Sequence, residues 1–445
     1  MSKRELKQWE PNNLDVFHYY GRWPSNRSPY FHIPFCQDIC TFCPFYREIL
    51  SNDELLDAYV KAIIKKKLNL NLVIKMCRKN KLQVFFLEGG TPSLLKPEHI
   101  RKIGLAIHKY FNLSELKEFS FEMNAKTITK DRVEALKEIG VTYGRMGVQT
   151  FNPKYRKIFQ LSATPDQVEH GVALLNENFP FVCIDMLYGF HGQSIDDFLK
   201  DLHFATSLNT KTIDVYPINN VVIQKRLDDA YQAHNFQPAS GLTKFSMNIL
   251  LNEYMRNNGY LPHNGHGYIK TKYDLTKNNP VVSDEYTFQY HETVYGYEGY
   301  EVIGFGRSAS FLLDGAYLYN CNDTVQYVKG LLGSNKLDID VEVYSKELCK
   351  QRGLILHLPY HGIAKKQKIN LDLIHEEIFI KLQNAIERGL VIETPNDYQL
   401  TKKGWYWYVN LLFYLAADTD HKAMKDYIET NRTGDLGKWQ IDWTY

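Results

Sequence analysis

Three closely spaced cysteines are the residues of this sequence with the clearest capacity for chemistry. Cys36, Cys40 and Cys43 lie within eight residues in the pattern C-x3-C-x2-C, directly after a short apolar run. Cysteine thiolates are the usual ligands of iron–sulfur clusters, and three of them on one tight loop can hold three irons of a [4Fe–4S] cube. The fourth iron then has no protein ligand, so it can bind and reduce a substrate. We therefore predict that this loop is a reaction centre.

A structural zinc site and a set of reduced cysteines without a metal are the alternatives. Structural zinc almost always has four protein ligands. The other cysteines are scattered singly along the chain, and none forms a second pair: Cys77, Cys183, Cys321 and Cys349. The spacing therefore favours the iron–sulfur cluster.

The first half of the chain alternates predicted strands and helices, which indicates six successive βα units. The strands are expected at 30–35, 83–87, 118–123, 143–149, 181–188 and 212–216. Helix starts separate them, such as Pro97 at a first helical position and the N-cap Thr164 followed by Pro165. Units of this kind form a parallel sheet with right-handed crossovers. We predict an α/β partial barrel. An open Rossmann sheet is the alternative, but no G-x-G-x-x-G follows the first strand.

Polar residues stand at the carboxyl ends of the predicted strands, where parallel barrels carry out their chemistry. Gly89-Gly90-Thr91 would let backbone approach a ligand closely, although a tight βα turn is the alternative. Glu122 could accept hydrogen bonds from a ribose diol, and Gln149 can both donate and accept. Asp185 lies in an otherwise apolar strand, where a buried carboxylate needs a partner such as a ligand amine or hydroxyl.

The second half of the chain is less regular. We predict an N-terminal extension over 1–28, the barrel over 29–235, an irregular α/β extension over 236–335 that completes the active site, and a C-terminal helical module over 336–445. A helix and β-hairpin within 378–404 resemble a winged helix. Winged helices often bind DNA, but acidic residues are interspersed among the lysines of this one, so we expect a packing or lid role.

Composition and charge exclude several classes of protein. The chain has 445 residues, with 53 basic and 51 acidic side chains, so its charge gives no reason to expect nucleic acid. The N-terminus lacks the apolar core of a signal peptide, and the longest apolar stretch near the C-terminus, 409–417, is too short to span a membrane. Seven cysteines argue against a disulfide scaffold. We expect a soluble cytoplasmic protein without a membrane or nucleic-acid partner.

At these residues the sequence resembles the radical SAM superfamily, and more closely the oxygen-independent coproporphyrinogen III oxidase family and its relatives. The similar segments are YFHIPFC with the two further cysteines, FLEGGTPSLL, FSFEMN, YGRMGVQTFN, IDMLYG and GFGRSAS. With the C-terminal module they span roughly residues 29–415 in the family's order. The resemblance implies a (β/α)6 partial barrel with a winged-helix-like module, a [4Fe–4S] cluster, and S-adenosylmethionine (SAM) on the open iron, where reduction yields a 5′-deoxyadenosyl radical.

The resemblance also implies a second SAM in the cavity and a set of SAM-contacting positions. Carried over residue by residue, these positions are Tyr30, Phe42, Gly89, Gly90, Thr91, Glu122, Gln149, Asp185, Ile218 and Ser310. The loop with His263 and His266 falls where relatives carry substrate-proximal residues. These histidines could donate protons or contact a tetrapyrrole or its metal, and a polar loop with hydrogen-bonded histidines is the alternative.

Two positions depart from the decarboxylase pattern. Phe45 stands where the decarboxylase has another cysteine, and Leu161 stands where it has an arginine that contacts SAM. Together with the ending Cys43-Pro-Phe-Tyr46, they make the chain more similar to the class C methyltransferases, which act on heteroaromatic natural products or methylate and open haem anaerobically. In those enzymes one SAM makes the radical and the second supplies the carbon.

We therefore expect two-SAM C-methylation of a tetrapyrrole or a flat heteroaromatic, with a flavodoxin- or ferredoxin-type electron donor. Coproporphyrinogen III decarboxylation and haem delivery as a chaperone are the alternatives.

Overall fold

The computed structural model describes residues 3–9, 27–69, 82–218, 224–277, 279–285, 296–297, 301–313, 316–334, 337–343, 350–422 and 426. The predicted extension over 1–28 is thus described only in the strand β1 (Lys3–Trp9) and from residue 27 onward. Among the described residues, no helix combines the length and apolar character needed to cross a membrane.

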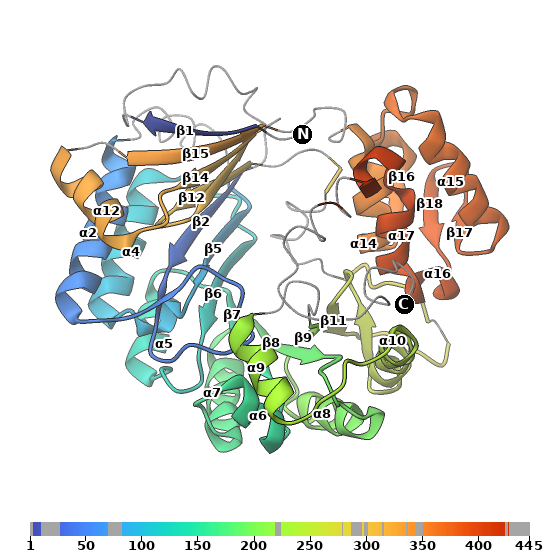
Figure 1. The fold of residues 1–445 in the computed structure, drawn as a ribbon, viewed down its shortest axis with the longest axis horizontal. Helices are drawn as coiled ribbons and strands as arrows, with labels where there is room; N and C mark the ends of the chain where they lie inside the picture. Colours follow the sequence, from blue (N-terminus) through green and yellow to red (C-terminus); the bar gives the residue numbers. More distant parts are fainter. Residues whose placement is uncertain are drawn as a thin grey trace.

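The described residues form a large sheet in the order β10-β11-β9-β8-β7-β6-β5-β2-β12. The strands of the predicted βα units run parallel to one another in this sheet. They are β2 (Arg27–Ile33), β5 (Val84–Gly89), β6 (Glu118–Met123), β7 (Tyr143–Gln149), β8 (Phe181–Tyr188) and β9 (Thr212–Pro217). They follow one another across the sheet in chain order, which confirms the predicted partial barrel. Within the described chain the sheet ends on β10 and β12, which are not neighbours, so the barrel is open (Figure 1).

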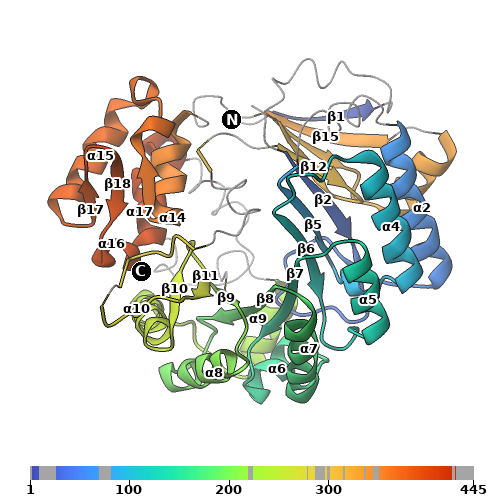
Figure 2. The same ribbon diagram turned by 180° about the vertical axis from the view of Figure 1, so that it is seen from behind.

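Helices cover the outer face of this sheet, as Figures 1 and 2 show from opposite sides. They are α2 (Asp53–Asn69), α4 (Pro97–Tyr110), α5 (Lys130–Glu138), α6 (Pro153–Phe159), α7 (Pro165–Asn178) and α8 (Ile195–Ser207). Several begin at the predicted caps. Thr164 and Gln167 form a reciprocal capping box at the start of α7, and the Ser194 hydroxyl accepts from the Asp197 amide at the start of α8. The main apolar core lies between these helices and the strands.

Three further strands extend the barrel sheet. β12 (Glu301–Phe305) pairs in parallel with β2, while β11 (Gly267–Lys270) and β10 (Tyr260–Pro262) add an antiparallel pair beyond β9. Helix α9 (Lys225–Ala233) lies near the end of the predicted barrel range, and helix α10 (Gly241–Asn257) lies in the extension expected to be irregular. A second sheet has the order β1-β15-β14-β13 within the described residues. Its strands besides β1 are β13 (Ser310–Leu313), β14 (Ala316–Asn320) and β15 (Leu337–Val343). Helix α12 (Thr324–Lys329) lies between β14 and β15 in the chain.

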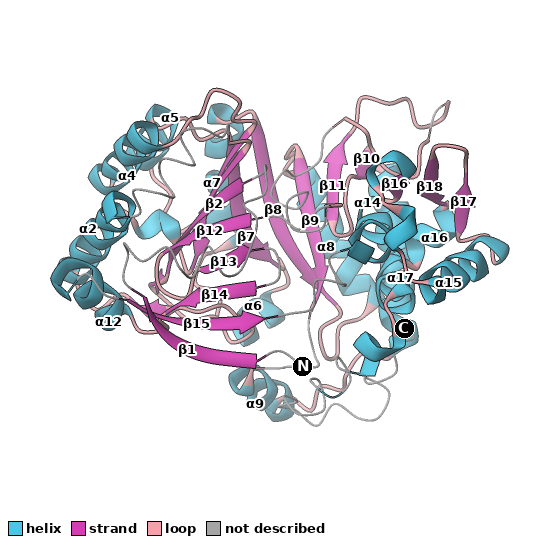
Figure 3. Ribbon diagram, turned by 90° about the horizontal axis from the view of Figure 1, so that it is seen from above, coloured by secondary structure: helices cyan, strands magenta, loops and turns pink. Residues whose placement is uncertain are grey.

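The C-terminal module has its own apolar core and its own small sheet, in which the described strands have the order β16-β18-β17. Its elements are α14 (Leu358–His361), β16 (Ile363–Lys365), α15 (Glu376–Glu387), β17 (Val391–Glu393), β18 (Asp397–Leu400), α16 (Lys402–Tyr406) and α17 (Tyr408–Leu415). Helix α15 followed by the β17–β18 hairpin gives the predicted helix-and-wing arrangement. Figure 3 shows the module beside β10 and β11, at one side of the open barrel.

The module is fixed to helix α10 by direct contacts. The Asn248 side chain donates a 2.8 Å hydrogen bond to the Tyr406 carbonyl, and Glu253 forms a 2.8 Å ion pair with Lys402. These contacts place α16 and α17 against the edge of the barrel, beside the carboxyl end of β9.

Candidate active site

The three predicted ligand cysteines lie on a loop that two short strands close. β3 (Phe35–Cys36) pairs in parallel with β4 (Glu48–Ile49), so the loop leaves and re-enters the fold at one point. Thr41 anchors the middle of the loop to α6. Its amide donates a 3.1 Å hydrogen bond to the Phe159 carbonyl, and its hydroxyl donates a 2.9 Å hydrogen bond to the Ile158 carbonyl. Cys36 is buried, and Cys40 and Cys43 are half-buried.

These cysteines have the chemistry that an iron–sulfur cluster needs. All of the described cysteines are free thiols, and Cys77 and Cys349 lie outside the described residues. Burial, together with the neighbouring thiols, raises the pKa of Cys40 to about 12, and burial also raises the pKa of Cys36 and Cys43. A cationic metal group held by these enclosed thiols would favour their thiolate form. The donor set therefore fits a [4Fe–4S] cluster.

The glycine pair after β5 packs directly on this loop. The Gly90 amide donates a 2.7 Å hydrogen bond to the Ile33 carbonyl, and a Cβ on Gly90 would lie 2.9 Å from the Cys36 sulfur. Gly89 has a φ of +129°, a conformation that side chains rarely tolerate. The Thr91 hydroxyl donates to the Cys36 sulfur over 3.6 Å. The segment therefore shapes the environment of a cluster ligand in addition to forming a turn.

Replacing Gly90 with alanine should impair cluster assembly. The new Cβ would lie 2.7 Å from the Phe35 carbonyl oxygen as well as 2.9 Å from the Cys36 sulfur, and overpacking of this kind costs about 1–3 kcal/mol. Iron content per chain after anaerobic reconstitution measures the effect. Gly333→Ala is the matched control, because its Cβ would have no neighbour within 4 Å. Equal iron content in the two variants would contradict the assigned packing role.

A buried arginine joins the predicted SAM-contacting carboxylates. Arg145 of β7 donates to Glu122 at 2.9 Å, to Asp185 at 2.8 Å and to Asp214 at 2.7 Å. The strand register places Glu122 opposite Arg145, and Asp185 opposite Asp214. Only 3% of the Arg145 side chain is exposed. We refer to Arg145, Glu122, Asp185 and Asp214 as the Arg145 cluster.

The Arg145 cluster and the neighbouring Glu88 contain more carboxylates than cations. Burial raises the pKa of Glu122 and of Glu88 to about 7, and that of Asp185 to about 8, while Arg145 acts in the opposite direction. Glu88 also has a hydrogen bond with the Tyr30 side chain. Four carboxylates around one guanidinium leave negative charge that favours a bound proton or a cationic ligand.

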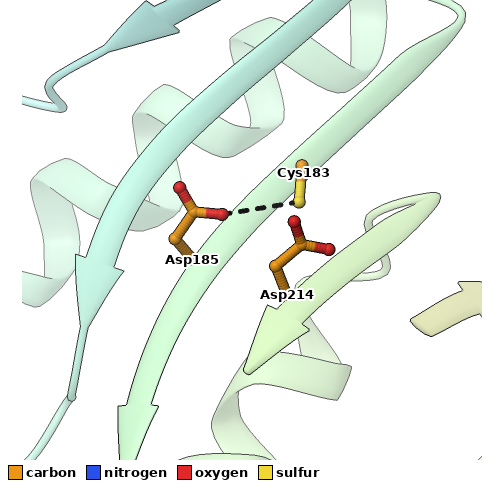
Figure 4. Close-up of side chains that lie close together, drawn as sticks. All are labelled: Cys183, Asp185 and Asp214. Carbon is orange, nitrogen blue, oxygen red and sulfur yellow. Dashed lines mark hydrogen bonds between the residues drawn. The ribbon is translucent and has the colours of Figure 1, made fainter. Parts of the chain in front are cut away.

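Figure 4 shows a trio within this region, Cys183, Asp185 and Asp214, whose potential metal-ligand atoms lie within 4.8 Å of one another. The Cys183 thiol donates to Asp185 over 3.7 Å. Both aspartates already accept from the same nitrogen of Arg145, so the guanidinium is their cation. Burial also raises the pKa of Cys183 well above its usual value. The trio is therefore the acidic side of a buried ion pair.

A pocket opens beside the cysteine loop, at the ends of β6 and β7. Cys40, Thr91, Asn124 and Leu161 are among its lining residues. Glu122 and Asp185 are not, so the pocket and the Arg145 cluster are two separate polar regions of the barrel. Charged and polar side chains share this lining with Leu161, among them Asp38, Arg156 and Gln160.

The remaining predicted SAM-contacting residues lie in different surroundings. The Phe42 ring lies 5.1 Å from that of Phe159, in an apolar cluster that also contains Ile218 and Leu161. Gln149 ends β7 after a bulge and has a φ of 72°. Ser310 begins β13, and its side chain lies outside the described part of the structure.

The two predicted histidines are enclosed, and each has its own neighbours. Asn264 contacts the His263 ring at 3.1 Å, and the His266 ring nitrogen Nδ1 lies 3.2 Å from the Tyr408 hydroxyl. Burial lowers the pKa of both histidines to about 4. Both rings are therefore uncharged at neutral pH, which suits hydrogen bonding better than proton donation from an imidazolium. A catalytic role for either histidine stays a prediction.

Sequence reasoning did not single out Arg145 or Asp214 as site residues. A signal was present, because Arg145 and Asp214 are charges inside otherwise buried strands. A buried charge requires an opposite partner. The same reasoning that selected Asp185 would have selected both residues.

Comparison with known proteins agrees with this geometry. Residues 30–205 match the family model described as the radical SAM superfamily. The chain is 25% identical over 391 residues to the heme chaperone HemW of Lactococcus lactis, covering 85% of this chain and 94% of that protein. It is 27% identical over 197 residues to anaerobilin synthase of Escherichia coli O157:H7, covering 44% of each. The solved structure of coproporphyrinogen III oxidase (HemN) from Escherichia coli superimposes with a TM-score of 0.68 at 18% identity, covering 91% of this chain and 98% of that one.

An open α/β barrel with a three-cysteine loop packed on a glycine pair at the strand ends defines one class of protein, and residues 30–205 of this chain form a radical SAM domain. Within the superfamily its homologues are HemN- and HemW-like proteins. The radical SAM domain implies a [4Fe–4S] cluster and SAM as cofactors.

Proposed function

We propose that this protein is a radical SAM methyltransferase that uses two SAM molecules to C-methylate a tetrapyrrole or a flat heteroaromatic. The observation that carries the proposal is Leu161, which lines the pocket beside Cys40 at the position where the resemblance implies an arginine for a decarboxylase. Arg156 also lines the pocket, but its guanidinium donates to the backbone carbonyls of Val148, Thr150 and Ala163. An apolar side chain cannot hold a SAM carboxylate there by an ion pair. The homologue named anaerobilin synthase supports a tetrapyrrole substrate.

The roles of the residues follow from their positions. Cys36, Cys40 and Cys43 would hold the cluster, and Thr91 and Gly90 shape the surroundings of Cys36. When bound, the cluster supplies the electron that cleaves SAM to a 5′-deoxyadenosyl radical. Glu122 and Asp185 offer negative charge to the sulfonium and amine of SAM, and Arg145 holds both carboxylates in place.

Two separate polar regions support the use of two SAM molecules. The pocket touches the cysteine loop through Cys40, while the Arg145 cluster lies deeper between β6 and β9. We propose that Phe42 and Ile218 contribute the apolar wall between them, because they share one cluster with Leu161. A flavodoxin- or ferredoxin-type protein is proposed as the electron donor.

Two other functions have specific support. The likeness to HemW extends over 85% of this chain, which favours haem delivery. The fold of HemN matches 91% of the chain, which favours oxidative decarboxylation of coproporphyrinogen III. Neither alternative accounts for an apolar Leu161 beside the cysteine loop as directly as methyl transfer does.

Product analysis separates the three functions. The reconstituted protein would be incubated anaerobically with SAM, a reductant, and haem, coproporphyrinogen III, or indole and thiazole substrates, and the products identified by mass spectrometry. Methyl transfer predicts a methylated product with S-adenosylhomocysteine. Release of CO2 would support decarboxylation instead, and stable haem binding without either product would support the chaperone.

A further inference from the structure

A continuous series of side-chain contacts connects the Arg145 cluster to the C-terminal module. Asp214 accepts a 3.1 Å hydrogen bond from the Tyr216 hydroxyl, at the end of β9. The Tyr216 ring lies 4.4 Å from the His266 ring, measured between centroids. His266 in turn lies 3.2 Å from the hydroxyl of Tyr408, the first residue of α17.

The module presses closely on the turn that carries His266. The Tyr360 ring of α14 lies 5.1 Å from His266, between centroids, with the two planes nearly perpendicular. A Cβ on Gly265 would lie 2.7 Å from ring carbons of both Tyr360 and Tyr408, so only glycine allows this approach. Asn264 buttresses the other side of the turn by accepting from the Gly267 amide at 2.8 Å.

The two hydrogen bonds nearest Arg145 have a defined direction. Burial raises the pKa of Tyr216 well above its usual value, so its hydroxyl stays protonated and donates to Asp214. One nitrogen of Arg145 donates to both Asp185 and Asp214. Weakening the Tyr216 bond would strengthen the hold of Asp214 on that nitrogen, which would shift Arg145 relative to Asp185.

We propose that Tyr408 is a positioning residue through which the C-terminal module sets the orientation of the Arg145 cluster. In this arrangement the winged-helix-like module forms a wall of the active site, and Tyr408, His266, Tyr216 and Asp214 transmit its position to Glu122 and Asp185. The inference rests on the proposed function, because it assigns those two carboxylates to SAM.

The test compares single hydroxyl deletions in the full-length, cluster-loaded protein. Tyr408→Phe and Tyr216→Phe each remove one hydroxyl of the series. Tyr398→Phe is the matched control, because Tyr398 is a buried tyrosine of β18 in the same module and contacts Lys366 and Glu393 instead. The measurements are iron content, the SAM dissociation constant and the electron paramagnetic resonance spectrum of the reduced cluster before and after SAM is added.

We expect Tyr408→Phe and Tyr216→Phe to keep the wild-type iron content but to bind SAM roughly three- to tenfold more weakly, the effect of one lost hydrogen bond. Their spectral change on SAM addition should differ from wild type, and that of Tyr398→Phe should not. Wild-type affinity and spectra in both variants would overturn the inference while leaving the proposed function intact. A wild-type protein that holds the cluster but binds no SAM would overturn the proposed function itself.

Discussion

Replacing Cys40 with alanine is expected to abolish cluster binding and every SAM-dependent activity. In the proposed site three thiolates would hold three irons of the cube. Cys40 would be one of these ligands, and it also lines the adjacent pocket. The loop would keep its anchors at Thr41 and on β4, so the chain should still fold. Iron content and visible absorbance after anaerobic reconstitution measure the first effect, and formation of 5′-deoxyadenosine measures the second.

Cys321→Ala is the matched control, since Cys321 is a half-buried thiol outside the cysteine loop whose sulfur contacts the Asp323 carbonyl. It should retain iron and SAM cleavage at the wild-type level. About four irons per chain in a protein that lacks all three loop cysteines would show that the cluster is held elsewhere.

Replacing Arg145 with leucine is expected to lower the free energy of unfolding by about 3–5 kcal/mol, because removing one member of a buried ion pair leaves charge uncompensated. Three carboxylates accept from Arg145 within 2.9 Å. Chemical denaturation of the apo protein at neutral pH measures the change.

Arg101→Leu provides the control for loss of a guanidinium. Arg101 makes two hydrogen bonds to Glu138, but both side chains are substantially exposed. Exposed pairs contribute little to stability, so this variant should unfold close to the wild-type midpoint. Similar destabilisation in the two variants would contradict the prediction, because loss of the buried Arg145 would then cost no more stability than loss of an exposed arginine.

The barrel could be predicted from sequence because its signals are local. Strands such as β5 are short apolar runs, and helices such as α7 begin at a recognisable cap. Helix α10 was missed for an equally local reason. Its buried face includes Asn248, Asn252 and Arg256, which interrupt the apolar periodicity that marks an amphipathic helix. The pairing of β12 with β2 joins segments far apart in the chain, and no local pattern specifies it.

The candidate site likewise has one part that a local motif predicts and another part that depends on long-range pairing. The cysteine loop is a compact sequence motif, and the structure places Gly90 and Thr91 against it. The Arg145 cluster depends on the register of the four adjacent strands β6, β7, β8 and β9. This register brings Arg145 of β7 within hydrogen-bonding distance of Asp214 of β9. Contact of His266 with Tyr408 depends on how the C-terminal module docks, so a sequence pattern could name the histidine but not its partner.

The fate of SAM tests two-SAM methyl transfer most directly. Each productive turnover should yield 5′-deoxyadenosine and S-adenosylhomocysteine in comparable amounts. With SAM deuterated on its methyl group, a radical that attacks the methyl of the second SAM should carry deuterium into 5′-deoxyadenosine, which mass spectrometry detects. Consumption of substrate with no S-adenosylhomocysteine and no deuterium transfer would contradict the methyltransferase assignment and favour decarboxylation.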